Sequence, residues 1–201
     1  MAKRVCIVNF KGGVGKTTLA VHLAYYLAKI KDRKVLLIDV DHQSSLSLVL
    51  LYEDEWKHCC KDGKTTNAIF ANYMEYGLKG LPDTGIIFKN GRNFYFPWSH
   101  LDLLPSDLKL DETEIDLAAT VHGDPIESSW TKRALICYWF DKNRIDEEYD
   151  YVIFDCPPAT KIVTQNAVVA SHGIIIPTIL DDVSIRGLPH LIGTVLVKVS
   201  N

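Results

Sequence analysis

Near the start of the chain stands the run Phe10-Lys11-Gly12-Gly13-Val14-Gly15-Lys16-Thr17-Thr18. An apolar run at 5–8 precedes it, and a segment with helical periodicity follows it. A strand, a glycine-rich turn and a helix in this order are typical of a phosphate-binding loop, because the glycines let successive N–H groups converge on one anion. The helix behind the turn adds the positive end of its dipole. The sequence therefore predicts a phosphate site near the N-terminus.

The polar residues of this loop have distinct expected tasks. Lys16 should reach the β- and γ-phosphates of a nucleotide, and the Thr17 hydroxyl should ligate Mg²⁺. The usual pattern has a glycine where this chain has Phe10, and a second lysine, Lys11, stands directly before the glycines. The residues expected to bind the nucleotide are Lys11, Gly12, Gly13, Val14, Gly15, Lys16, Thr17 and Thr18.

Length and composition indicate one α/β domain over residues 1–201. The chain has 47% hydrophobic residues and a net charge of −3, so it can bury a sizeable core and has no global positive field for nucleic acid or lipid. Apolar runs such as 35–38 and 174–176 are too short to span a bilayer, and the N-terminus lacks the apolar core of a signal peptide. Five cysteines without a C-x-x-C pair favour a reducing cytoplasm. We expect a cytoplasmic domain without a membrane partner.

Apolar strands alternate with helical segments along the chain. Further strands are expected at 34–39, 101–104, 151–155 and 173–177, with a hairpin at 85–96 whose turn is Asn90-Gly91. Helices are expected at 18–30, 44–51, 66–76, 108–119, 125–140, 162–170 and 184–197. The packed face of the helix at 125–140 is expected to hold Trp130, Leu135, Ile136 and Trp139. The alternation predicts a doubly wound α/β fold, with a mostly parallel sheet, helices on both faces and a ligand at the carboxyl ends of the strands.

Two of the expected strands end in acidic residues. One runs into Asp39-Val40-Asp41-His42-Gln43, and the other into Asp155-Cys156-Pro157-Pro158. In a parallel sheet these ends lie at one edge with the phosphate loop, so the carboxylates face the phosphates. Carboxylates suit a Mg²⁺ shell, commonly through water, because Mg²⁺ gives up its water reluctantly. A single strand-end Asp is more often a helix cap or a solvated acid, but three strand ends in this order favour a metal site.

The three motifs together resemble those of the ParA/MinD family of deviant P-loop ATPases. The matching stretches are 11–18, 36–43 and 149–158, with weaker echoes at 101–106, 164–167 and 174–177. The resemblance extends from Arg4 to about Val197, with gaps over 52–100. The Asp-Cys-Pro-Pro and Leu-Leu-Pro-Ser sequences are most similar to ParA-type partition proteins. The resemblance implies the P-loop NTPase fold, with ATP and Mg²⁺ as cofactors.

The resemblance also assigns roles to individual residues. It implies that Thr17 binds Mg²⁺ and that Asp39 and Asp155 support the metal from one ligand sphere further out. It implies that Asp41 positions or activates the attacking water. Lys11 corresponds to the family's signature lysine, which acts across a dimer interface. The expected catalytic set is therefore Lys11, Lys16 and Asp41.

An activity and partners follow from the same resemblance. The leading hypothesis is a switch that forms a homodimer on ATP and hydrolyses it slowly under stimulation by a ParB-like partner. It would partition or position plasmid or chromosome DNA through nonspecific DNA binding, which depends on phosphate contacts. The basic residues at hand for DNA are Lys132, Arg133, Lys142 and Arg144. The alternatives are a nonhydrolysing nucleotide-bound scaffold, or a MinD-like or other cargo-positioning ATPase of the same superfamily.

Two departures from the family pattern carry expectations of their own. His42 stands where the family usually has proline, so the loop with Asp41 gains a titratable neighbour, expected to be a neutral solvated histidine. Family members usually continue beyond the position of Asn201 with elements that help to hold the adenine and supply basic residues for DNA. We therefore expect a C-terminally shortened form of the fold, either natural or a piece of a longer chain.

Overall fold

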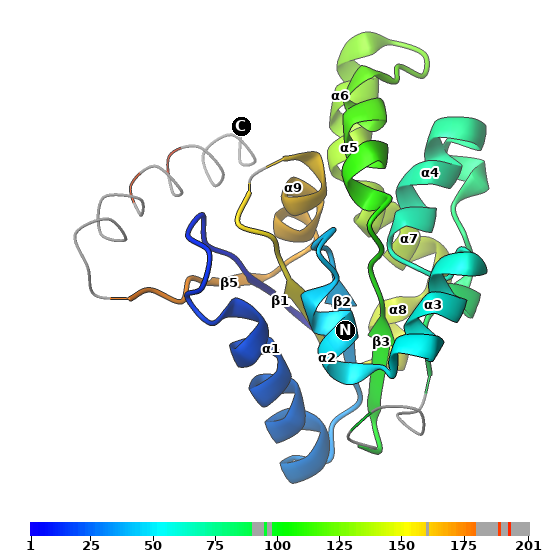
Figure 1. Cartoon of the computed structure of the whole chain (residues 1–201). Coiled ribbons are helices and arrows are strands. Elements are labelled where there is room, and N and C mark those ends of the chain that lie inside the picture. Colours follow the sequence, from blue (N-terminus) through cyan, green and yellow to red (C-terminus); the bar gives the residue numbers. More distant parts are fainter. Residues whose placement is uncertain (90–94, 96–97, 160, 180–188, 190–192, 194–201) are drawn as a thin grey trace.

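A computed structural model describes residues 1–89, 95, 98–159, 161–179, 189 and 193 of the chain (Figure 1). At its centre lies a sheet of five strands, β1 (Lys3–Ile7), β2 (Val35–Asp39), β3 (Leu101–Leu104), β4 (Tyr151–Asp155) and β5 (Gly173–Ile175). Their order across the sheet is β3-β2-β4-β1-β5, and every neighbouring pair is parallel. The predicted α/β fold with a parallel sheet is confirmed.

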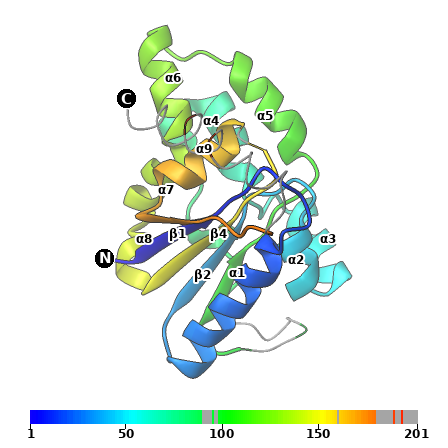
Figure 2. The same ribbon diagram turned by 90° about the vertical axis from the view of Figure 1, so that its left-hand side faces the viewer.

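Helices cover both faces of this sheet, because parallel strands are joined by helical crossovers. One face packs against α1 (Lys16–Tyr25) with its π-helical end Tyr26–Ile30, α2 (Ser45–Leu50) and α3 (Glu53–Lys61). The other packs against α4 (Asn67–Tyr76), α5 (Leu110–Ala119), α7 (Leu135–Asn143), α8 (Ile145–Glu148) and α9 (Ile162–Val169), while α6 (Pro125–Arg133) lies on α7 and α9. Figures 1 and 2 show α1 on one side of the sheet and α7 and α9 on the other. None of the helices in the described ranges is long and apolar enough to cross a bilayer.

The hydrophobic core is divided into two by the alternation of side chains along each strand. In β2, Leu36 and Ile38 join the cluster under α4, α7 and α9, whereas Val35 and Leu37 join the cluster under α1. All four side chains are fully buried. Strands that are apolar on both faces are expected in the middle of a sheet that helices cover on both sides, so the continuous apolar run of β2 is explained.

The register of the sheet sets the position of the site. In β4, Asp155 pairs with Ile7 at the end of β1 and with Asp39 at the end of β2. The phosphate loop therefore leaves the sheet directly beside the end of β4, and the end of β2 lies on the other side of β4. A shift of one residue in either ladder would turn these side chains to the opposite face.

Several predictions about single elements need correction. The region 125–140 is not one helix: α6 and α7 are separated at Ala134, and Trp130 is 49% exposed instead of packed. In the region 85–96, residues Thr84–Ile86 form a 3-10 turn, and Phe88 pairs antiparallel with Leu103. The predicted Asn90-Gly91 turn and the predicted helix at 184–197 lie outside the described residues, apart from positions 189 and 193 of the latter. The helices α3 and α8 and the 3-10 turn Gly77–Gly80 were not predicted.

A buried amide on α9 explains the break between α6 and α7. The Asn166 side chain is fully buried; its Nδ2 donates to the Lys132 carbonyl at 2.7 Å, and its Oδ1 accepts from the Ile136 N–H at 3.2 Å. These are backbone groups on either side of the break. Nδ2 also donates to the Ile162 carbonyl at 3.0 Å. In a continuous helix the Ile136 N–H would donate to the Lys132 carbonyl. The Asn166 amide gives each of these two backbone groups a partner instead.

We predict that Asn166→Ala destabilises the fold by about 2–4 kcal/mol, because each buried polar group left without a partner costs roughly 1–3 kcal/mol. Urea unfolding of the variant measures this. Its neighbour Gln165→Ala is the control: that half-buried side chain bonds Arg133 at 2.9 Å, and the groups it leaves can turn to water, so we expect a loss below about 1 kcal/mol. Equal losses in the two variants would contradict this account of the break.

Candidate functional site

The loop between β1 and α1 has the backbone that a phosphate cradle requires. Gly13 and Gly15 have φ of 72° and 83°, a left-handed conformation that glycine adopts without strain. Apart from adjoining residues, no heavy atom of the described chain lies within 4 Å of where a Cβ would stand on Gly12, Gly13 or Gly15. The open space in front of the loop meets the N-terminus of α1, where N–H groups lack helical partners. The loop fits a phosphate group.

Lys16 is folded back onto this loop. Its side chain is buried, and its Nζ donates to the Lys11 carbonyl at 3.2 Å. Burial lowers the pKa of the Lys16 ammonium, while the carboxylates of Asp155 and Asp41 act in the opposite direction. The cation therefore lies close to the acids and is held by one neutral oxygen. A phosphate in the cradle would offer it a stronger, charged acceptor.

Thr17 connects the loop to the end of β4. Its Oγ1 donates to Asp155 Oδ2 at 2.6 Å, which leaves the lone pairs of the hydroxyl oxygen for a cation. Asp155 is 1% exposed, and its Oδ1 has no hydrogen-bond partner among the described residues. Burial raises the pKa of Asp155 to about 6, in part against the hydrogen bond from Thr17. A buried carboxylate with a spare oxygen, beside a hydroxyl, suits Mg²⁺.

The remaining ligands of such a metal ion would have to come from outside the protein. The described part of the chain contains no group of three or more His, Cys, Asp or Glu side chains placed to hold a metal ion. Mg²⁺ commonly binds through one or two protein groups, with water and substrate phosphates completing its octahedron. Thr17 and Asp155 fit this pattern.

Asp39 lies deeper than Asp41 and has different contacts. It is fully buried; its Oδ1 accepts from the Asp41 N–H at 3.1 Å, and its Oδ2 accepts from Ser47 N and Oγ at 2.9 and 2.7 Å. Burial and the Asp155 carboxylate raise the pKa of Asp39 to about 8, whereas the hydrogen bonds from Ser47 and Asp41 lower it. In this structure Asp39 holds the loop after β2 and the start of α2.

Asp41 faces a cleft of about 320 Å³ that the phosphate loop borders on its other side. The cleft is lined by residues of 12–18 together with Asp41, Gln43, Ser45 and Pro158. Asp41 Oδ1 accepts from the Gln43 N–H at 2.9 Å, and His42 Nδ1 lies 3.8 Å from the same oxygen. The structure therefore brings Lys16, Thr17 and Asp41 to one cleft. The described lining does not include Lys11, Val14 or Asp39.

Two residues that the sequence analysis did not single out shape this site. Asn9 is buried and ties the loop to the end of the sheet: its Nδ2 donates to the Pro177 carbonyl at 2.7 Å, and its Oδ1 accepts from the Lys11 N–H at 3.1 Å. Ser44 is fully buried with φ of 53°, a left-handed conformation that costs energy for any residue except glycine. Both stand beside predicted motifs; the contact of Asn9 with Pro177 and the turn of the backbone at Ser44 into α2 emerge only in the folded structure.

The basic residues proposed for DNA contact are engaged within the protein. Lys132 is buried and donates to the carbonyls of Ala118 and Thr120 at 3.0 and 2.7 Å. The other three have partners as well: Arg133 bonds Gln165, Lys142 bonds the Leu81 carbonyl, and Arg144 pairs with Glu147. Lys132 is thus closed to DNA, whereas the Arg144 side chain is 74% exposed in a surface pair with Glu147.

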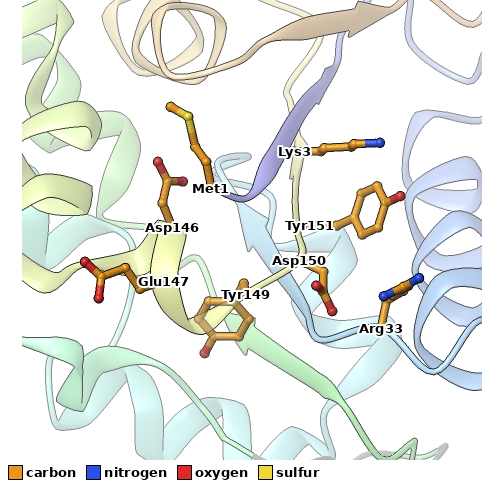
Figure 3. Close-up of a pocket in the computed structure, with 8 residues that line it drawn as sticks. All are labelled: Met1, Lys3, Arg33, Asp146, Glu147, Tyr149, Asp150 and Tyr151. Carbon is orange, nitrogen blue, oxygen red and sulfur yellow. The ribbon is translucent and has the colours of Figure 1, made fainter.

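A second hollow, of about 410 Å³, lies at the opposite edge of the sheet (Figure 3). It borders the first residues of β1 and β4, Lys3 and Tyr151, and charges of both signs surround it, including Arg33 and Glu147. Asp150, also in its wall, accepts from the Lys34 N–H at 2.9 Å. It is larger than the cleft at the carboxyl edge, but its described lining holds no glycine, and the acidic side chains of Asp146, Glu147 and Asp150 would repel a phosphate. We assign the site to the carboxyl edge.

Comparisons with known proteins agree with this assignment. A family model described as "AAA domain" matches residues 2–200. The sporulation initiation inhibitor protein Soj of Bacillus subtilis (strain 168) is 31% identical over 201 residues, which cover 97% of this chain and 65% of Soj. The chromosome-partitioning ATPase Soj of Thermus thermophilus is 29% identical, over 96% of this chain and 61% of that protein. The chain thus spans less than two thirds of these two relatives.

Solved structures show the same fold. A plasmid partition protein from Borrelia burgdorferi is 26% identical with a TM-score of 0.69, over 100% of this chain and 76% of that chain. Cobyrinic acid a,c-diamide synthase from Mycobacterium smegmatis, with bound ADP and magnesium, has a TM-score of 0.73 at 23% identity, over 98% of this chain and 68% of that chain. At such identity the second likeness concerns the fold alone. Together with the phosphate loop and the two acid-ended strands, these matches show that the chain belongs to the AAA-domain family, as a P-loop ATPase of the ParA/MinD type.

Proposed function

We propose that this chain binds Mg²⁺-ATP in the cleft at the carboxyl edge and hydrolyses it, as a switch in the partition or positioning of DNA or another cargo. One observation carries the proposal: Lys16, Thr17 and Asp41 border one cleft, in front of a glycine cradle that is open to phosphate. Relatives support it, since a plasmid partition protein from Borrelia burgdorferi has been solved bound to AMPPNP, at 25% identity.

Binding would exchange contacts that the loop already makes. Lys16 would leave the Lys11 carbonyl for the β- and γ-phosphates, and the N–H groups of 12–18 would hold the phosphate oxygens. Thr17 would keep its hydrogen bond to Asp155 and offer its oxygen to Mg²⁺. When bound, Mg²⁺ neutralises charge on the β- and γ-phosphates. Asp39 would support this arrangement by accepting the hydrogen bond from the Asp41 N–H.

The proposed hydrolytic role falls to Asp41. It lines the cleft, and the Gln43 N–H at 2.9 Å orients one of its carboxylate oxygens. Its loop lies beyond the end of β2, so the carboxylate can hold a water molecule beside the γ-phosphate. A positioned general base of this kind contributes roughly 10²–10⁴-fold to a rate.

Dimerisation would bring Lys11 to the nucleotide. Lys16 supplies the cation of the subunit's own loop, and the described lining of the cleft does not include Lys11. A triphosphate on a second copy of the chain would attract this additional lysine. Nucleotide state would then control association, as a switch requires.

DNA and a ParB-like stimulating partner complete the proposal. They rest on the relatives, because the basic residues that the sequence offered for DNA are engaged within the protein. Phosphate release measured with and without DNA distinguishes the ATPase from the nonhydrolysing scaffold that remains the alternative.

The first prediction of this proposal concerns binding. Lys16→Ala and Thr17→Ala should each weaken Mg²⁺-dependent binding of a fluorescent ATP analogue about 10- to 100-fold. A hydrogen bond to a charged group contributes roughly 1.5–3 kcal/mol, which corresponds to a loss of this size. Thr17→Ser keeps the hydroxyl and should bind normally, as should Lys29→Ala, which removes an exposed lysine far along the same helical segment. Wild-type affinity in both alanine variants would refute the assignment of the cleft.

The second prediction separates binding from hydrolysis. Asp41→Ala should bind Mg²⁺-ATP as the wild type does, while its steady-state phosphate release falls roughly 10²–10⁴-fold. Asp54→Ala, at an exposed position of α3, is the control and should turn over normally. Normal hydrolysis by Asp41→Ala would remove this residue from the mechanism.

The third prediction concerns the dimer. Lys11→Ala should still bind ATP but stay monomeric in light scattering with ATP, and its stimulated hydrolysis should be lost. By comparison with arginine fingers, a cation supplied from a second subunit contributes roughly 10³–10⁵-fold to the rate. If the variant dimerises and turns over as the wild type does, Lys11 has no role across an interface.

A further inference from the structure

Beneath the Asp41 loop runs a continuous chain of buried hydrogen bonds. It starts at Ser106, after β3, whose N–H donates to Ser47 Oγ at 3.0 Å. Ser47 Oγ in turn donates to Asp39 Oδ2 at 2.7 Å, and the Ser47 N–H reaches the same oxygen at 2.9 Å. Asp39 Oδ1 then accepts from the Asp41 N–H at 3.1 Å. The chain thus connects the loop after β3 to the backbone of the proposed hydrolytic residue.

Every side chain in the centre of this chain is closed to solvent. Ser47, Asp39 and Ser106 are each 0% exposed. Water therefore cannot replace a hydrogen bond that is lost, and an electrostatic contact is stronger here than at the surface. The orientation of the Asp39 carboxylate is set by these donors alone among the hydrogen bonds of the described residues.

The outer end of the chain is fixed by contacts from α3, which the sequence did not predict, and from the residue before α4. Trp56 of α3 donates through Nε1 to the Ser106 carbonyl at 2.9 Å. Thr66, the residue before α4, donates through Oγ1 to the Asp39 carbonyl at 2.7 Å and to the Pro105 carbonyl at 3.2 Å. The segment around Ser106 is thereby held against β2, so Ser47 has a fixed acceptor on one side and a fixed donor on the other.

Ser47 is the side chain on which this connection depends. Its hydroxyl is both donor and acceptor, as the middle of such a chain requires. It comes from α2 and does not stand among the described residues that line the cleft, unlike Ser45 two positions earlier. Without the hydroxyl, Asp39 would keep one donor on Oδ2 and could rotate, and the Asp41 N–H would lose a fixed acceptor.

We propose that Ser47 is a positioning residue for ATP hydrolysis: it fixes Asp39, and through Asp39 the backbone of Asp41, without touching the nucleotide. The inference rests on the proposed role of Asp41 for its effect on catalysis. Its structural part, the control of the Asp41 loop by Ser47, is independent of any activity. The test therefore has two arms.

The chain offers a matched control in Ser106. Its hydroxyl is as buried as that of Ser47, but its Oγ has no hydrogen-bond partner among the described residues; the chain uses only its backbone N–H. Ser106→Ala therefore removes a hydroxyl of the same size from the same region and leaves every hydrogen bond of the chain in place. A general effect of serine removal would appear in both variants.

The first arm measures amide hydrogen exchange in the nucleotide-free protein. In Ser47→Ala, the Asp41 amide should exchange at least about tenfold faster than in the wild type, because its acceptor is no longer held. Ser106→Ala and Ser47→Thr, which keep the chain, should exchange as the wild type does. If Ser47→Ala does not fold, Ser47→Cys, with similar volume and a weak donor, takes its place under the same expectation. Unchanged exchange at Asp41 would overturn the inference.

The second arm measures steady-state hydrolysis. Ser47→Ala should lower kcat roughly 10- to 100-fold with KM for Mg²⁺-ATP nearly unchanged, since a small misplacement of a reacting group has an effect of this size. Ser47→Thr should restore kcat, and Ser106→Ala should not lower it. Fast exchange with normal kcat would overturn the positioning role. Fast exchange in a chain whose wild type shows no hydrolysis would instead refute the proposed function and leave the control of the loop by Ser47 established.

Discussion

The site depends on the hydrogen-bonded register that places the carboxyl ends of β1, β2 and β4 side by side. Asp155 pairs with Ile7 on one side and with Asp39 on the other, so the phosphate loop and both acidic loops leave the sheet at one point. The hydrogen bond of 2.6 Å between Thr17 and Asp155 then joins the loop to the neighbouring strand. The fold builds the site because parallel strands send all their carboxyl ends to the same edge.

Features that a local pattern encodes could be predicted from the sequence, and features that distant contacts impose could not. The strands and the phosphate loop follow from apolar runs and glycine spacing. The helix α3 is short and mostly polar, and Cys59 is its one buried residue, so few apolar residues mark it in the sequence. The break at Ala134 depends on Asn166, which lies about thirty residues further along the chain. Likewise the sequence assigned Asp39 to the metal and Asp41 to the attacking water, but the contact of Asp39 with Ser47 could not be predicted from it.

The two acids at the carboxyl end of β2, Asp39 and Asp41, differ in burial and therefore in what they can contact. Asp39 is fully buried, and protein donors hold both of its oxygens, whereas Asp41 borders the cleft two residues later. Proteins as different as a plasmid partition protein and a diamide synthase share this fold. Function must therefore be argued from the side chains that reach the cleft and from those that hold them, since a fold can host many activities.

The central claim is that nucleotide binds at the carboxyl edge of the sheet. Titration of Mg²⁺-AMPPNP into the ¹⁵N-labelled chain, followed by amide chemical shifts, tests it most directly. We expect saturable shifts that are largest at Gly13, Gly15, Lys16 and Gln43, and none at Lys3 or Glu147, which border the hollow at the amino edge. Shifts concentrated at that hollow, or no saturable change in the phosphate loop, would contradict the account.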